Sequence, residues 1–342
     1  MKLSILIPLY NAETFIARCI NSLINQNLSQ DDYEIIILND GSTDNSKNIV
    51  ESYTQKYQNI HLYNQENKGE GATRNTLFKL AQGDYVYCLD SDDYVLNGVL
   101  KQLIDFAVDK NLDILGFQTL KTKNENLSIS KIDFKNQVIP VTTGKEFLLS
   151  TPNHRVEVWW YFIKRSYLEK NKFSFGKGPF IADVMFTIEN FIKAKRVAYL
   201  PITIHRYYQS PDSILRCNDI TKRKKVLDCY TAMILEFSQL IDSLTAKENP
   251  NDKALIQHLK QKRDGFTFVL LFRLIKLKVS TKSFKDVVSS FENSNAYPIK
   301  NYVGTKNSSM KFKLLNNTVN HKKILFSYAR LYHFYPQKHY VS

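Results

Sequence analysis

The first 117 residues alternate between short β-branched runs and amphipathic segments, and this alternation restricts the fold more than any other feature. The expected strands are Leu3–Leu9, Tyr33–Leu38, Ile60–Tyr63, Asp84–Leu89 and Asp113–Phe117. The segments with helical spacing between them are Ala12–Gln26, Asp44–Tyr57, Thr73–Ala81 and Val99–Asp109. A βα series of this kind predicts an α/β fold, with a doubly wound, mostly parallel sheet and helices on both of its faces.

The pattern changes after the fifth expected strand. Weakly periodic, Lys/Asn-rich sequence leads to an aromatic cluster at Val156–Ile163 and to one further expected helix, Asp183–Lys193. The later sequence is helical in its spacing, and it follows a turn-forming segment, Ser210–Ser213. We therefore predict an α/β domain over residues 1–215 and a helical, basic C-terminal region over residues 216–342.

The net charge of +14 is concentrated at the C-terminal end of the chain. Residues 1–250 contain 30 Lys and Arg against 29 Asp and Glu, whereas residues 251–342 contain 17 against 4, a net charge of +13. One interpretation is a solvated, Lys-rich face. Another is contact between residues 264–342 and an anionic membrane surface, because each basic side chain near such a surface contributes about 1 kcal/mol. A third is attraction to a nucleic-acid backbone, but no recognition motif accompanies the charge, so we predict no specific nucleic-acid partner.

The remaining global features indicate a cytoplasmic protein. The four cysteines have no C-x-x-C spacing, and no apolar run approaches the length of about 20 residues that a membrane-spanning helix needs. The apolar run at Leu3–Leu9 is too short for a signal-peptide core and contains Pro8. We expect a protein of the cytoplasm that is peripheral on the cytoplasmic face of the cell membrane.

Polar loops follow the first four expected strands. They are Tyr10–Asn11, Asn39–Asp44, Asn67–Gly71 and Asp90–Asp93. Ligands of open α/β sheets bind outside the carboxyl ends of the strands, so all four loops should meet at one edge of the sheet. A nucleotide along this edge would find carboxylates, backbone amides at helix starts and a site for a metal ion.

The loop with Asp90, Asp92 and Asp93 is the most acidic of the four. Carboxylates so close in sequence repel one another, and a hard divalent cation relieves that repulsion. Mg²⁺ or Mn²⁺ held by carboxylates and phosphate oxygens is the usual arrangement for nucleoside-diphosphate chemistry. The alternative is that the loop is an N-cap box for the helix expected to begin near Val99, with Asp92 or Asp93 simply solvated.

A glycine pair in the third loop imitates part of a dinucleotide-binding fingerprint. Gly69 and Gly71 follow a strand and precede a helix, but Arg74 occupies the third small position and no glycine follows the first strand. These departures argue against a nicotinamide or flavin oxidoreductase. Arg74 has two interpretations: a ligand-binding cation, or a helix-surface cation paired with Glu70 four residues earlier.

Five stretches together resemble the family 2 inverting nucleotide-sugar glycosyltransferases of GT-A fold. They are Leu3–Asn11, Asn39–Asp44, Asn67–Gly69 with Ala72–Asn75, Gly83–Tyr85 and Leu89–Asp93. The resemblance is strong up to about residue 115 and weaker up to about residue 215. Beyond that residue there is none. It implies transfer of a sugar from a nucleotide-diphosphate donor, with UDP favoured as the nucleotide, to a hydroxyl of a glycan or lipid-linked acceptor. The transfer would invert the anomeric configuration and would belong to bacterial cell-surface polysaccharide synthesis.

The resemblance also implies roles for residues of the first two loops. Pro8, Tyr10 and Asn11 would form the loop beneath the nucleoside, and Asp40 would accept the base N–H. Asn39 departs from the Asp-Asp-Gly-Ser sequence common in the family, but the second acidic position is the one expected to read the base. Tyr10 could alternatively be a packed aromatic residue.

In the third and fourth loops the resemblance implies contacts with the rest of the donor. Lys68 and Arg74 would lie near the base or the diphosphate. Asp90 would approach the ribose and the metal, Ser91 would belong to the same donor-binding loop, and Asp92 would coordinate the divalent metal directly.

The family's general base comes from an acidic pair, typically Glu-Asp, that opens a helix in the second half of the domain. Here Ala182 stands where Glu is usual, and Asp183 is the matching carboxylate. The role requires a carboxylate within hydrogen-bond reach of the acceptor hydroxyl. One alternative is that Asp183 only begins a helix, favoured there by the helix dipole. Another is that the chain is a non-catalytic nucleotide-sugar-binding protein.

The aromatic cluster provides candidates for acceptor binding. Trp159 and Trp160 would form part of an acceptor platform, because aromatic faces suit the apolar faces of sugars. The alternative is that these rings belong to the core. His205 is expected to be structural rather than catalytic, since a metal site at this edge needs only carboxylates.

Overall fold

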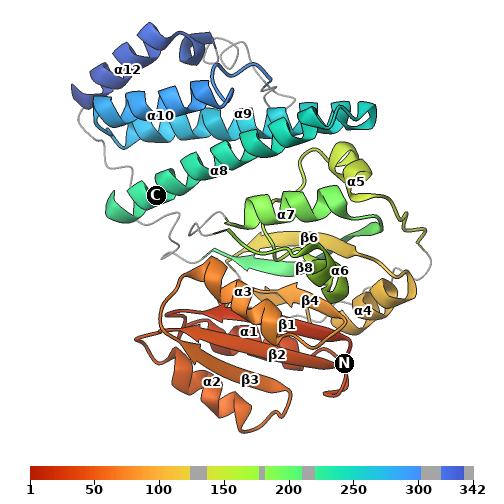
Figure 1. Ribbon diagram of the computed structural model, residues 1–342. Helices are drawn as coiled ribbons and strands as arrows, with labels where there is room; N and C mark the ends of the chain where they lie inside the picture. Colours follow the sequence, from red (N-terminus) through yellow and green to blue (C-terminus); the bar gives the residue numbers. More distant parts are fainter. Residues whose placement is uncertain (124–136, 177–181, 210–219, 302–316, 335–342) are drawn as a thin grey trace. The chain divides into compact units, whose positions relative to one another are not determined.

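The structure is a computed structural model that describes residues 1–123, 137–176, 182–209, 220–301 and 317–334 (Figure 1). The chain divides into two compact units, Met1–Arg216 and Cys217–Ser342. The turn-forming segment Ser210–Ser213 lies outside the described residues.

One eight-stranded sheet forms the centre of the N-terminal unit, in the order β3-β2-β1-β4-β7-β6-β8-β5. The strands are β1 Leu3–Leu9, β2 Tyr33–Asp40, β3 Ile60–Gln65, β4 Tyr85–Cys88, β5 Tyr94–Val95, β6 Ile114–Thr122, β7 Tyr161–Lys164 and β8 Val197–Tyr208. Strands β3, β2, β1 and β4 are parallel to one another, and β6 is parallel to β8. Strand β7 is antiparallel to both of its neighbours, and β5 is antiparallel to β8.

Seven helices surround this sheet among the described residues of the unit (Figure 1). They are α1 Ile16–Ile24, α2 Ser46–Thr54, α3 Glu70–Leu80, α4 Leu100–Asp109, α5 Gly144–Ser150, α6 Arg165–Asn171 and α7 Ala182–Lys193. Every residue of β2 and nearly every residue of β1 is buried, which requires cover on both faces of the sheet. The predicted fold class is therefore confirmed.

A close approach of two backbones fixes the entry into β4. A Cβ atom at Gly83 would lie 2.6 Å from the backbone of Leu3 and Ser4, so only glycine fits at this position. The Ser4 hydroxyl donates to the buried Glu34 carboxylate at 2.6 Å and accepts from the Gly83 N–H at 2.8 Å. These contacts hold β4 in register beside β1, and β4 leads directly into the acidic loop.

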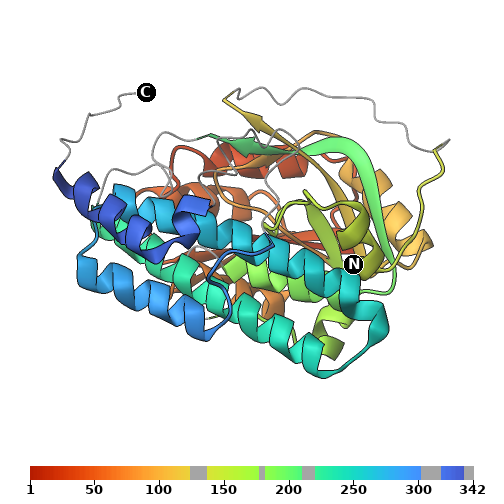
Figure 2. The same cartoon turned by 90° about the horizontal axis from the view of Figure 1, so that it is seen from above.

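The C-terminal unit is helical in its described part (Figure 2). Its elements are α8 Ile220–Ala246, the 3₁₀ turn η1 Pro250–Asp252, α9 Lys253–Lys276, α10 Thr281–Asn293 and α12 Lys322–Phe334. Within the described ranges, no helix combines the length and the apolar character needed to span a bilayer.

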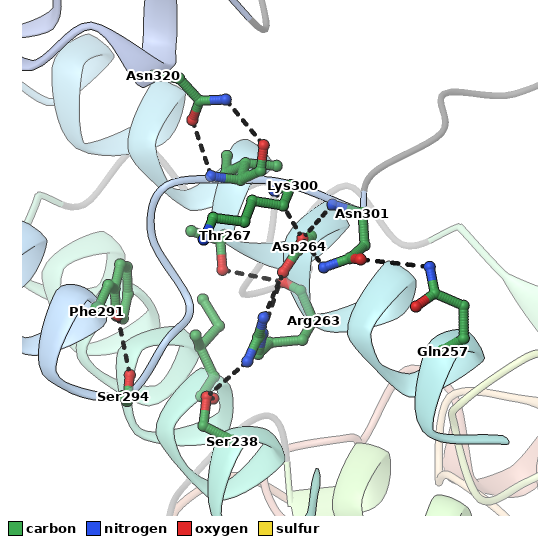
Figure 3. Close-up of polar contacts among 12 residues, drawn as sticks. Ser238, Gln257, Arg263, Asp264, Thr267, Phe291, Ser294, Lys300, Asn301 and Asn320 are labelled. Carbon is green, nitrogen blue, oxygen red and sulfur yellow. Dashed lines mark hydrogen bonds and ion pairs between the residues drawn. The ribbon is translucent and has the colours of Figure 1, made fainter. Parts of the chain in front are cut away.

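A buried ion pair organises the centre of this unit (Figure 3). The fully buried Asp264 carboxylate accepts from the guanidinium of Arg263 at 2.9 and 3.1 Å. Its other oxygen accepts from the backbone N–H groups of Lys300 and Asn301 at 3.1 and 2.8 Å. Arg263 also donates to Ser238 of α8 at 3.4 Å. The Asp264 carboxylate thus joins α9 to the loop at residues 300–301, and Arg263 joins α9 to α8.

Candidate active site

The loops after β1 and β2 are hydrogen-bonded to each other. Asn11 adopts a left-handed backbone (φ 47°), and its side-chain oxygen accepts from the Thr43 N–H at 2.8 Å. Its own N–H donates to the Ser42 hydroxyl at 3.1 Å. Tyr10 is 53% exposed, so it is not a packed core residue, whereas Pro8 lies partly buried within β1. The first loop therefore presents an aromatic ring at the carboxyl edge of the sheet.

Asp40 connects the end of β2 to the start of α3. Its buried carboxylate accepts from the backbone N–H groups of Lys68 and Gly69 at 2.8 and 2.9 Å, and from the Gln65 amide at 2.8 Å. Gly69 has a positive φ of 83°, which glycine adopts without strain. Asp40 thus shapes the turn on which the exposed Lys68 stands. An ionised carboxylate has about four lone-pair sites. The three hydrogen bonds to Asp40 therefore leave it the capacity to accept from a base N–H.

The departure at Asn39 has a structural explanation. The Asn39 amide nitrogen donates to Asn64 at 3.0 Å, and its oxygen accepts from the Ser42 N–H at 3.0 Å. An ionised aspartate accepts only, so it could not make the first of these bonds. An asparagine amide therefore fits this position, where the side chain has to donate one hydrogen bond and accept another.

Arg74 connects three carboxylates beneath the site. Its side chain is 1% exposed, and its guanidinium donates to Asp90 at 2.7 Å and to Asp183 at 2.8 Å, while also pairing with Glu70. The pairing with Glu70 was expected, but the interpretation of Arg74 as a helix-surface cation is wrong. The side chain lies inside because two further carboxylates, from the loop after β4 and from α7, neutralise its buried charge.

Asp183 lies in the first turn of α7 and faces the same guanidinium as Asp90. Burial raises the pKa of the Asp183 carboxyl, and the Arg74 charge opposes that rise. Its side chain is still 16% exposed, so a substrate can reach it. A Cβ placed at Gly71 would lie 3.6 Å from Ala182, which shows that α3 approaches this end of α7 closely, beside a small residue.

The acidic loop has the donor set of a divalent-cation site. Oxygen atoms of Asp90, Asp92 and Asp93 lie within 4.8 Å of one another. Burial, together with the charges of Asp93 and Asp90, raises the pKa of Asp92 to about 8. The nearby charge of Arg18 opposes this rise but does not cancel it. The N-cap alternative is wrong, because α4 begins at Leu100 and its capping residue is Val99, with no side-chain cap, and because Asp93 is buried rather than solvated.

Asp93 differs from the other two carboxylates of the loop. It is fully buried, lies 3.0 Å from His205 and accepts from the Tyr208 N–H at 2.8 Å. Burial raises the pKa of Asp93 and lowers that of His205 to about 3, so burial disfavours the charged form of each group. This contact joins the loop to β8 and leaves Asp90 and Asp92, which with Ser91 are only partly buried, as the accessible groups.

One cation at this loop is not evident from the sequence. Arg18 of α1 donates to the Asp92 carbonyl oxygen at 2.7 Å, and its guanidinium lies 4.0 Å from the centre of the Tyr208 ring. The arginine is separated from the loop by 74 residues. Within its own helix it resembles an ordinary surface cation, and no local pattern signals the contact.

The two tryptophans do not present an open platform. Trp159 is 3% exposed and stacks on His205, with ring centres 4.4 Å apart, and on Tyr207 at 5.6 Å. Trp160 is 2% exposed and packs beside Phe191 of α7. Any contact of these rings with an acceptor therefore has to occur within a cavity rather than on an exposed surface.

The sheet and its order of strands fit a GT-A type fold, and comparisons place the chain in a family. Residues 4–176, about half of the chain, match the family model described as Glycosyl transferase family 2. EpsJ of Bacillus subtilis, an uncharacterized glycosyltransferase, is 34% identical over 215 residues, which are 62% of each chain. The chain belongs to glycosyl transferase family 2.

Two solved structures share the fold. Residues 1–349 of TarS of Staphylococcus aureus in complex with UDP-GlcNAc superpose with a TM-score of 0.69 at 19% identity, covering 97% of this chain and 90% of that one. The mannosyltransferase PcManGT of Pyrobaculum calidifontis, in complex with GDP-Man and Mn²⁺, gives 0.51 at 13% identity over 98% and 88%. In sequence, TarS, a poly(ribitol-phosphate) β-N-acetylglucosaminyltransferase, is 28% identical, and the match covers only 35% of its length.

Proposed function

We propose that this protein transfers a sugar from a UDP-sugar to a hydroxyl of a glycan or lipid-linked acceptor, with inversion, in cell-surface polysaccharide synthesis. The observation that carries the proposal is the placement of Asp90 and Asp183 on the guanidinium of Arg74. Asp90, which would face the sugar donor, and Asp183, which would accept the proton, come from distant parts of the chain. Arg74 holds both in one cluster. The UDP-GlcNAc bound to TarS supports the choice of donor.

The reaction follows from the position and pKa of Asp183. Its carboxylate takes the proton of the acceptor hydroxyl as the oxygen attacks the anomeric carbon. The bond from that carbon to the diphosphate breaks, and the nucleoside diphosphate leaves with the electron pair. Because attack comes from the face opposite the leaving group, the anomeric configuration inverts. Arg74 holds the carboxylate in place through the bond to one of its oxygens.

A divalent ion, Mn²⁺ or Mg²⁺, fits the acidic loop. Asp90 and Asp92 would hold it, whereas Asp93 is already engaged with His205 and Tyr208. The close carboxylate oxygen atoms and the raised pKa of Asp92 support a cation between them, in addition to Arg74 on Asp90. When bound, such an ion neutralises the charge on the leaving diphosphate. The Mn²⁺ in PcManGT supports this assignment.

Metal binding is predicted to strengthen with pH. The pKa of Asp92 is about 8, so at pH 6 the cation must displace a proton from this carboxyl. The apparent affinity for Mn²⁺, measured by calorimetry, should rise about tenfold per pH unit up to pH 8 and then level off. Asp92→Asn should abolish the dependence, and Asp109→Asn on the exposed end of α4 should not change it. Equal affinity at pH 6 and pH 9 would refute the assignment.

A panel of donors tests the proposed activity. The full chain would be incubated with Mn²⁺ and UDP-glucose, UDP-N-acetylglucosamine or GDP-mannose, and release of the nucleoside diphosphate would be followed. At least one UDP-sugar should be turned over, slowly by hydrolysis when no acceptor is present. Binding of UDP-sugars with no release under any condition would instead support the non-catalytic alternative.

We also propose that the C-terminal unit holds the protein at the cytoplasmic face of the cell membrane through anionic lipids. Ile324, Tyr328 and Leu331 of α12 are 49, 45 and 62% exposed and follow the i, i+4, i+7 spacing of one helix face. Lys323 and Arg330 are exposed beside them. An apolar stripe flanked by cations is typical of a helix that lies in the membrane interface. The excess of basic residues over 264–342 complements an anionic leaflet.

Liposome flotation tests the membrane contact. The full chain should float with vesicles of phosphatidylglycerol and phosphatidylcholine at low salt, and less so as salt rises. Leu331→Ser should lower the bound fraction several-fold. Val108→Ser on α4 removes a similarly exposed side chain and should leave flotation unchanged. No flotation at low salt would contradict the contact, and retention of DNA in its place would favour the nucleic-acid alternative.

A further inference from the structure

A cavity of about 270 Å³ lies in the N-terminal unit and has no part in the donor site described above. It is bordered by β6, by the end of α5 with the loop that follows, by Trp160 and by Tyr199 of β8. Small-molecule sites in proteins usually enclose about 300–1,000 Å³, so this cavity has the size for a single ring.

The aromatic wall of the cavity depends on a glycine. A Cβ at Gly116 would lie 2.6 Å from the Trp160 ring and 3.0 Å from the Tyr199 ring, so both rings occupy space that any side chain would fill. Phe147 packs against the same two rings, with centres 6.1 and 5.7 Å away. The result is a rigid apolar wall suited to the C–H face of a sugar.

The polar groups of the cavity favour a neutral ligand that is rich in hydroxyls. The exposed amide side chains of Gln118 and Asn153 line it and offer donors and acceptors, although the Gln118 oxygen also accepts from the Thr203 hydroxyl at 3.2 Å. None of the described residues that line it carries a carboxylate, which disfavours a metal ion. Arg155, the arginine among the described lining residues, already pairs with Glu157 at 3.7 Å and lies over the Trp159 ring, which disfavours a phosphate.

The cavity lies along the helix that carries the proposed base. Phe147 and Trp160 both pack on Phe191 of α7, with ring centres 5.2 and 5.3 Å away. Phe191 follows Asp183 by eight residues, which corresponds to about 12 Å of helix. A ligand in the cavity is therefore too far from Asp183 to be the reacting group, but near enough to belong to the same oligosaccharide.

We propose that this cavity binds a pyranose ring of the acceptor glycan at least one sugar away from the hydroxyl that reacts. The inference rests on the proposed transferase function and adds a site that selects for the length and identity of the acceptor. Trp160 forms part of the cavity as a buried wall, and its indole N–H has no hydrogen-bond partner among the described residues.

The chain offers a built-in reporter, because Trp160 lines the cavity and the only other tryptophan of the sequence, Trp159, precedes it directly. The full-length protein would be titrated with methyl glycosides of glucose, galactose and N-acetylglucosamine and with cellobiose, and tryptophan fluorescence would be followed. At least one saccharide should give a saturable change. Gln118→Ala should weaken it about fivefold, the effect of losing one hydrogen bond to a ligand. Gln58→Ala, a matched exposed glutamine by α2, should not.

A second variant and a second ligand make the outcome decisive. Asn153→Phe fills the cavity from an exposed loop position and should abolish the saccharide response while UDP binding, measured by calorimetry, remains. An unchanged response in Asn153→Phe would overturn the proposal. So would UDP binding with no response to any saccharide, which leaves the transferase function intact. A saccharide response without any binding of UDP or UDP-sugars would instead refute the transferase function.

Discussion

Asp183→Asn is expected to lower the rate of sugar transfer by about 10²–10⁴-fold, the range that a positioned general base contributes. Asparagine has nearly the same shape and still offers an oxygen to Arg74, but it cannot accept the proton of the acceptor hydroxyl. Calorimetry should show UDP binding within about twofold of wild type, since a contact outside the donor pocket adds little to donor affinity. Turnover would be measured as UDP release.

Glu189→Gln provides the matched control for this prediction. Glu189 lies on α7, six residues beyond Asp183, and is also partly buried with a raised pKa. Glu189 is not one of the carboxylates that pair with Arg74, so removing its charge should leave turnover unchanged. Near-normal transfer by Asp183→Asn would remove Asp183 from the mechanism.

The wild-type rate should also depend on pH through Asp183. Only the ionised carboxylate accepts a proton, so the rate falls as the pH drops through its pKa. Because burial raises that pKa, the acidic limb should lie above the pH at which an ordinary aspartate titrates.

Arg74→Met is expected to destabilise the protein by about 3 kcal/mol or more at pH 8, the lower end of the cost of breaking a buried ion pair. The change leaves Glu70, Asp90 and Asp183 close together without their shared cation. Protonation relieves the repulsion among carboxylates, so the loss of stability should be smaller at pH 5 than at pH 8. Urea unfolding at the two pH values measures both effects.

Two further substitutions sharpen this test. Lys79→Met removes an exposed cation from the same helix, α3, and should change stability by less than about 0.5 kcal/mol. Arg74→Lys keeps the charge but cannot bridge several carboxylates with a planar fork, so it should rescue stability only in part. A loss below about 1 kcal/mol in Arg74→Met at pH 8 would contradict the role of Arg74 as the centre of the site.

The N-terminal half of the fold was predictable because its physics is local. Continuous β-branched runs such as Ile35–Leu38 form parallel strands buried on both faces, and parallel strands bring their following loops to one edge. The second half of the sheet was not predictable in the same way. Strand β8 contains Pro201, which argues against a strand, and its pairing with β6 shifts register around that residue. Strand β7 has only four residues within an aromatic cluster.

The residues of the candidate site also differ in how far the sequence predicts their roles. Asp90, Asp92 and Asp183 could be named from the sequence because each follows a recognisable stretch. The bridge through Arg74 joins positions 109 residues apart, and no local pattern encodes it. Asp93 resembled its acidic neighbours, and only its burial against His205 separates its role from theirs.

The stereochemistry of the transferred sugar tests the central claim most directly. The full chain would be supplied with Mn²⁺ and a UDP-sugar of α configuration, and the anomeric proton of the first product would be followed by NMR from the start of the reaction. A single displacement assisted by Asp183 predicts the β anomer as the initial product. An initial product of α configuration would contradict the proposed mechanism.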